Sequence, residues 1–114
     1  MQTATVRKLP KSLIPEWVKN DPFWSSALYI LQTAARREPK FMQLKHLVNF
    51  EHALIEFDAM KQAAASWSRG EKLLVDLAAH LFNERHPFNL SELDYLDSFN
   101  RKTALEAIRL RFRV

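Results

Sequence analysis

The chain has 114 residues, 47% of them hydrophobic, and 17 Lys and Arg against 13 Asp and Glu give a formal net charge of +4. This size and hydrophobic content predict one folded domain over residues 1–114. The absence of cysteine excludes disulfides, thiolate metal sites and a cysteine nucleophile, and it favours a reducing cytoplasm. The presence of only one glycine excludes glycine-rich phosphate loops.

Prolines and an N-cap residue define the first third of the chain. Residues 1–12 are predicted to form an N-terminal arm, because a proline interrupts any helix there. Asp21 followed by Pro22 is a strong signal for a helix start. The helix is predicted to run to about Arg37, because Pro39 follows it closely and the residue before a proline avoids the helical region.

The middle third predicts two further helices. Residues 40–65 contain neither glycine nor proline, and their apolar side chains recur at helical spacing, so one long helix is expected. Ser68 and Glu71 have the spacing of a capping box. They predict a helix from Arg69 to about Arg85.

The last third predicts a short helix capped by Asn89 and a longer one capped by Asp97. The longer helix has an apolar face formed by Leu105, Ile108 and Phe112. From residue 108 to residue 114, apolar residues alternate with arginine, which is also typical of a strand. We expect helix to near residue 110, with a strand pairing with residues 3–9 as the alternative.

Together these elements predict an all-α bundle of about five helices, with short β-like terminal arms as an option. No apolar run approaches the length of about 18 residues that a membrane span needs, so no membrane association is expected. The chain carries no sequence motif for a cofactor, and none is expected.

The charges are unevenly distributed along the chain. Residues 1–19 and 101–114 are basic, whereas residues 76–97 are acidic. A short helix followed by a basic one could place cations against nucleic-acid phosphates. The candidate residues for that role are Arg101, Lys102, Arg109, Arg111 and Arg113.

A weaker hypothesis concerns metal binding. Asp76, His80 and Glu84 are spaced four residues apart, so on a helix they share one face and could hold a divalent ion. The Glu-x-x-His pairs of helical metal sites are absent, however, and an exposed polar stripe explains the same spacing. No catalytic residue is predicted, since no serine lies in a nucleophile elbow.

Residues 67–112 carry two motifs that match or nearly match a group of small proteins. The motif residues are Leu77, Ala78, Leu81, Phe82 and Asn83, and then Leu96, Asp97, Asn100, Ala104, Leu105, Ala107, Ile108, Arg111 and Phe112. On these residues the chain resembles small uncharacterised helical proteins of Firmicutes and their phages. The resemblance implies a shared fold and a bacterial or phage origin, and no known activity.

These observations favour a non-enzymatic protein-interaction module in the cytoplasm, with a partner protein or a second copy of the chain as its ligand. The alternative is a basic nucleic-acid-binding protein that uses the two C-terminal helices. A metal-dependent enzyme is the least supported reading.

Overall fold

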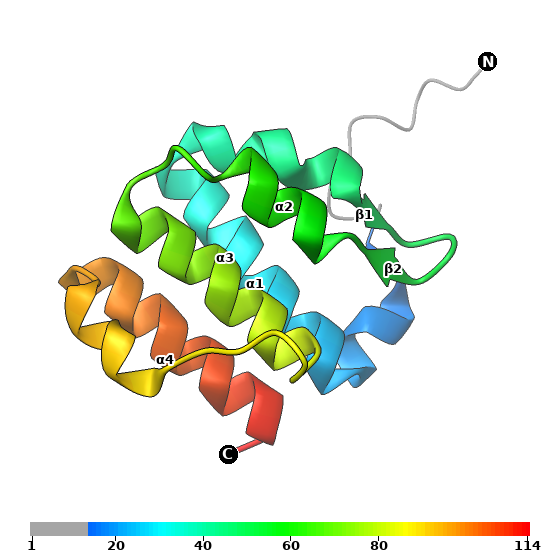
Figure 1. The fold of residues 1–114 in the computed structure, drawn as a ribbon. Coiled ribbons are helices and arrows are strands. Elements are labelled where there is room, and N and C mark those ends of the chain that lie inside the picture. Colours follow the sequence, from blue (N-terminus) through cyan, green and yellow to red (C-terminus); the bar gives the residue numbers. More distant parts are fainter. Residues whose placement is uncertain (1–13) are drawn as a thin grey trace.

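Helices make up most of residues 14–114, the part of the chain that the computed structural model describes (Figure 1). In chain order the elements are η3 (Glu16–Asn20), α1 (Pro22–Arg37), η4 (Pro39–Leu47), β1 (Val48–Asn49), β2 (Leu54–Ile55), α2 (Phe57–Ala63), α3 (Arg69–Phe82), η5 (Leu90–Tyr95) and α4 (Ser98–Phe112), where η denotes a 3-10 helix. The all-α class is therefore confirmed. The predicted arm at residues 1–12 lies outside the described residues.

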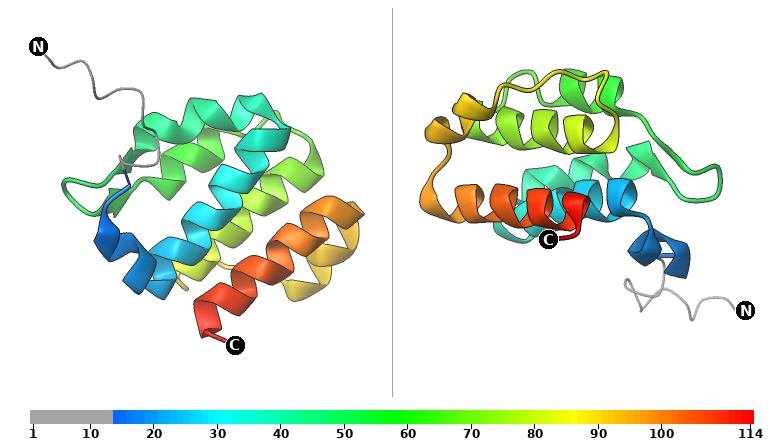
Figure 2. Two further views of the ribbon diagram at one scale, coloured as in Figure 1. Left: turned by 180° about the vertical axis from the view of Figure 1, so that it is seen from behind. Right: turned by 90° about the horizontal axis from the view of Figure 1, so that it is seen from below.

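Helix α1 is the centre of the bundle. It packs extensively against both α3 and α4, which contact each other much less. The view from behind shows α1 lying between η4 and α4 (Figure 2). The predicted start is confirmed, because the carboxylate of Asp21 accepts hydrogen bonds from the backbone N–H groups of Phe23 and Trp24. The helix ends at Arg37, before Pro39, as predicted.

An aromatic cluster at the start of α1 joins the surrounding elements. The ring of Trp24 lies 5.0 Å from Trp17 in η3, 5.8 Å from Phe50 and 5.3 Å from Phe82 at the end of α3, centroid to centroid. Phe57 at the start of α2 in turn contacts Phe82 at 5.5 Å. The pairs of Trp24 with Trp17 and with Phe82 are edge-to-face, and such pairs contribute about 0.5 to 1.5 kcal/mol each beyond area burial.

Residues 40–65 do not form the single helix that the sequence predicts. They form η4, a hairpin of β1 and β2, and the short helix α2. Val48 pairs with Ile55 in antiparallel register, and the side chain of Asn49 accepts a hydrogen bond from the backbone N–H of His52. Asparagine contacts of this kind favour turns over helix, which accounts for the reversal of the chain despite its helical apolar spacing.

The caps predicted in the second half of the chain are confirmed. Ser68 and Glu71 form a reciprocal capping box at the start of α3. Asn89 and Asp97 accept backbone hydrogen bonds at the starts of η5 and α4. Helix α3 ends at Phe82 rather than near residue 85. Helix α4 continues to residue 112, so the helical prediction for the C-terminal segment is confirmed and the strand alternative is wrong.

Helix α4 turns a different face toward the core from the one that its apolar pattern predicts. Leu105 and Phe112 were expected on a shared apolar face with Ile108, but they are 53% and 60% exposed, and Ile108 is only partly buried. The fully buried positions are Ala104 and Ala107. Small side chains allow two helices to approach closely, and α4 therefore packs against α1 through this narrow face.

The hairpin turn contains a strained residue that yields a prediction. Ala53 has a φ of 51°, in the left-handed region that glycine adopts without steric cost. We expect Ala53→Gly to raise the free energy of unfolding by about 0.5 to 1 kcal/mol, because relief of strain outweighs the added entropy of the unfolded chain. Urea denaturation measures the change. Ala59→Gly inside α2 is the control and should destabilise the fold by about 1 kcal/mol; equal destabilisation by both substitutions would contradict the prediction.

Candidate interaction surface

The outward side of α4 carries large apolar side chains beside cations. We call the exposed side chains of Lys102, Leu105, Arg109 and Phe112 the α4 face. They share one side of the helix because they are separated by three, four and three residues. Ala104 and Ala107 are fully buried, whereas the larger Leu105 and Phe112 are mostly exposed to solvent.

Arg101, one of the residues predicted to contact nucleic acid, is directed toward the protein itself. Its guanidinium donates hydrogen bonds to the backbone carbonyls of Leu93, Asp94 and Leu96, at 3.2, 3.4 and 2.7 Å. These carbonyls belong to the end of η5, where the helix leaves acceptors without intrahelical partners. Arg101 thus closes η5 onto the first turn of α4.

Arg111 also has a structural position. Its Nε donates a hydrogen bond to the carbonyl oxygen of Leu81 at 3.1 Å, which joins α4 to the end of α3. Its guanidinium lies 3.7 Å from the ring centroid of Phe23 and 4.9 Å from that of Phe112. Stacking on aromatic rings is a favourable arrangement for arginine, so this side chain binds three helices together.

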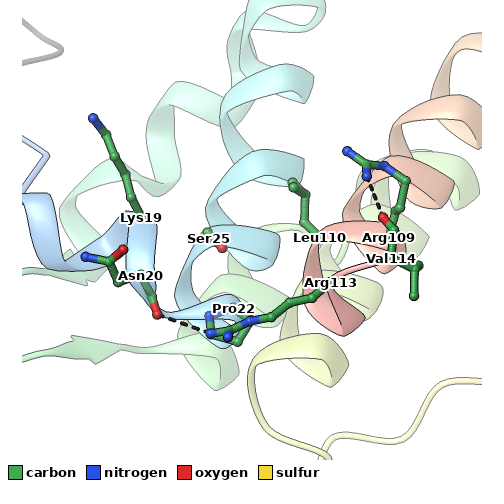
Figure 3. A pocket seen from close by; sticks show the side chains of 8 residues that line it. All are labelled: Lys19, Asn20, Pro22, Ser25, Arg109, Leu110, Arg113 and Val114. Atoms are coloured by element: carbon green, nitrogen blue, oxygen red, sulfur yellow. Dashed lines mark hydrogen bonds between the residues drawn. The ribbon is translucent and has the colours of Figure 1, made fainter.

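Arg109 and Arg113 line a groove between the end of α4 and the start of α1, with a volume of about 580 Å³ (Figure 3). We call it the basic groove; its lining residues are Lys19, Asn20, Pro22, Ser25, Arg109, Leu110, Arg113 and Val114. Lys19 and Arg109 stand on opposite sides, and Arg113 reaches across to the carbonyl oxygen of Asn20 at 3.3 Å (Figure 3). No lining residue is acidic.

Sequence reasoning missed Lys19 as a partner of Arg109 and Arg113. It lies 90 residues or more before them, and only the antiparallel packing of α1 and α4 brings the three cations to one groove. The available signal was that residues 1–19 and 101–114 are both basic. Of the five predicted C-terminal cations, the structure brings two to the groove and leaves Lys102 exposed on the α4 face.

The candidate metal residues do not form a site. Helix α3 ends before Glu84, so this carboxylate no longer shares a helical face with Asp76 and His80. The Nδ1 of His80 lies 2.7 Å from the carbonyl oxygen of His86. Burial raises the pKa of Asp76 above its usual range, although Lys61 and Lys72 oppose this effect. Across residues 14–114, no group of three or more His, Asp or Glu side chains could hold a metal ion.

The surroundings of the buried His86 favour the neutral form of its imidazole. Only 5% of the residue is exposed, and its Nδ1 lies 3.2 Å from the Nζ of Lys61. Burial lowers the pKa of His86, and the positive charges of Lys61 and Arg85 lower it further, against smaller opposing effects of Asp58 and Asp76. With Lys61 as the donor, Nδ1 is the acceptor, which favours the neutral tautomer that carries its proton on Nε2.

Comparisons with known protein families, with curated proteins and with solved structures give no match. Within residues 14–114, no helix combines the length and the apolar character that crossing a membrane requires. A function for the chain therefore has to be argued from its own surface.

Arg101 and Lys102 offer a matched pair for testing the structural role of the first. We expect Arg101→Met to lower the free energy of unfolding by about 1 to 2 kcal/mol, because the carbonyls at the end of η5 lose a charged donor. Lys102→Met removes the same charge from the α4 face and should change it by less than about 0.5 kcal/mol. Urea denaturation compares the two; equal effects would contradict the structural role of Arg101.

The position of His86 predicts a pH dependence of stability. Because its pKa is lowered in the folded protein, the unfolded chain binds the proton more readily. The free energy of unfolding should therefore be highest above about pH 6.5, the ordinary pKa of histidine, and should fall as the pH is lowered below it. Urea denaturation at pH values between about 8 and 5.5 measures this slope. His86→Gln should flatten it, whereas His46→Gln, at an exposed histidine, should not.

Proposed function

We propose that the chain is a non-enzymatic protein-interaction module whose α4 face binds an amphipathic segment of another protein. That segment carries carboxylates beside its apolar side chains. One observation carries the proposal: Leu105 and Phe112 are more than half exposed on a helix whose fully buried side chains are those of Ala104 and Ala107. Full burial of an exposed side chain of this kind contributes roughly 1.5 to 3 kcal/mol, and about half of that is still to be gained at each of these positions, so the two together can anchor a partner.

The charges of α4 support an acidic partner. The helix contains four cations, and its one carboxylate, Glu106, is bound by Arg109 at 2.8 and 3.0 Å. This pairing leaves α4 without an unpaired carboxylate, so Lys102 and Arg109 lie beside the apolar side chains with no free negative charge on the helix. Complementary charges speed association and suppress wrong partners.

A second copy of the chain is a less favourable ligand for this surface. A symmetric dimer places the same patch of both copies together. Each copy would then bring the cations of its own α4 face against an equally basic surface of the other copy, and like charges at an interface oppose association. A homo-oligomer stays the alternative among protein partners.

Nucleic-acid binding by the C-terminal helix pair is the second candidate function, and the basic groove is the observation that favours it. Against it, the carbonyl contacts of Arg101 and Arg111 direct two of the five proposed cations into the protein. We further propose a cytoplasmic location, supported by the absence of cysteine. A bacterial or phage origin likewise stays a prediction from the sequence resemblance.

The proposal is tested by selecting peptides of about 15 residues, roughly four helical turns, from a random displayed library against the full chain. Selected peptides should combine large apolar residues with an excess of Asp and Glu. Leu105→Ser and Phe112→Ser should each weaken their binding about fivefold or more, because each removes about 1 kcal/mol or more of the apolar burial that the partner adds. Fluorescence anisotropy with labelled peptides measures the affinities.

Leu90→Ser is the matched control, since Leu90 is 65% exposed but belongs to η5 rather than α4. It should leave peptide binding unchanged. Binders that respond to Leu90→Ser and ignore Leu105→Ser would contradict the assignment of the α4 face. A sizing column separates a heterologous partner from self-association, because the proposal expects a monomer in the absence of peptide.

A further inference from the structure

Arg113, the residue that ends α4, has a backbone conformation that arginine rarely adopts. Its φ and ψ are 58° and 46°, in the left-handed region, and its backbone N–H bonds to the carbonyls of Arg109 and Leu110. Glycine is the residue most often found at this position after a helix, because it has no Cβ to clash. An arginine here costs stability, and strain of this kind is concentrated at functional sites.

The strained backbone directs the side chain of Arg113 across the basic groove. Its Nη2 is bound to a single backbone oxygen, that of Asn20, at 3.3 Å, and the side chain is exposed. Lys19 and Arg109 flank it from the two walls, and the hydroxyl-bearing Ser25 lies between them (Figure 3). The groove is therefore lined by two guanidinium groups and one ammonium group, and by no acidic side chain.

We propose that the basic groove binds carboxylate side chains of the partner segment that docks on the α4 face, with Arg113 as the central contact. The inference rests on the proposed function and specifies where the acidic end of the partner lies. Arg109 belongs to both surfaces, so the groove continues the α4 face at the C-terminal end of the helix. A planar guanidinium can bind both oxygens of a carboxylate at once.

The existing contacts of the three cations leave room for such a ligand. Lys19 pairs with Glu16 at 3.3 Å, and both side chains are exposed, so this ion pair contributes little and can be exchanged. Glu106 binds Arg109 through Nε and Nη2 and holds the guanidinium in place. The Nη1 of Arg109 contacts only the backbone oxygen of Val114. Neither Glu16 nor Glu106 lines the groove.

The test uses three labelled probes with the full chain. The first is an amphipathic helical peptide of about 15 residues with leucines on one side and several Glu residues at one end. The second replaces those Glu residues with Gln, and the third is a single-stranded oligonucleotide of about the same length. Fluorescence anisotropy at about 50 and 200 mM salt gives their dissociation constants. The Glu peptide is expected to bind about tenfold more tightly than the Gln peptide, a difference of about 1.4 kcal/mol.

Arg113→Gly separates binding from folding. It removes the guanidinium and relieves the backbone strain, so the Tm should stay the same or rise while the Glu peptide loses about fivefold to tenfold in affinity. Arg113→Ala removes the same group, keeps the strain and should weaken binding equally. Lys19→Ala should act in the same direction, whereas Lys45→Ala, at an exposed cation of η4 that does not line the groove, should have no effect.

Each other outcome has a definite meaning. In one outcome, Leu105→Ser weakens the binding of both peptides, but Arg113→Gly and Lys19→Ala leave the difference in affinity between the Glu and Gln peptides intact. The groove proposal is then overturned and the proposed function stands. If neither peptide binds, or if Leu105→Ser and Phe112→Ser leave both unaffected, the proposed function fails as well. The oligonucleotide could instead bind more tightly than the Glu peptide and lose this binding in Arg113→Gly. That outcome would make a nucleic acid the ligand and overturn the choice of a carboxylate.

Discussion

The close approach of α4 to α1 is the constraint on which the candidate site depends. Ala104 and Ala107 are fully buried on α4, and Ala27 and Ala34 are buried on α1. Packing in protein interiors is dense enough that one methylene matters, so a face of small residues fixes both the distance between two helices and the rotation of each about its axis. Once α4 is fixed in this way, Leu105 and Phe112 have no place in the core and lie mostly in solvent.

Helix ends are the part of the fold that the sequence predicts best. Asp21, Ser68, Asn89 and Asp97 all cap the elements that they were expected to cap, because a cap is a contact between residues three or fewer positions apart. Such contacts need no knowledge of the rest of the chain. The rotation of α4 about its axis is a different matter, since it depends on which face fits against α1. The sequence pattern placed the large apolar Leu105 in the core, whereas the structure buries the small Ala104 and Ala107 instead.

Residues 40–65 show the same limit for a local conformation. Apolar spacing alone favours a helix there, and neither glycine nor proline marks the turn. The hairpin forms in part because the side chain of Asn49 accepts a hydrogen bond from the backbone of the turn. It also forms because Phe50 packs beside Trp24 of α1, a residue distant in the sequence. Ala53 accepts a left-handed conformation as the cost of that arrangement. Tertiary packing has overridden local preference.

The net charge of +4 also acquires a structural meaning from the fold. Arg101 and Arg111 stabilise the ends of η5 and α3 by binding carbonyls that the helices leave without partners, so they add positive charge without offering it to a ligand. Arg113 does the reverse, because its conformation lowers stability and extends a guanidinium over an open groove. Arginines that stabilise the fold need no further explanation, whereas one that strains the backbone does. This contrast is the physical reason for placing the anion-binding role at Arg113 rather than evenly along the basic C-terminal segment.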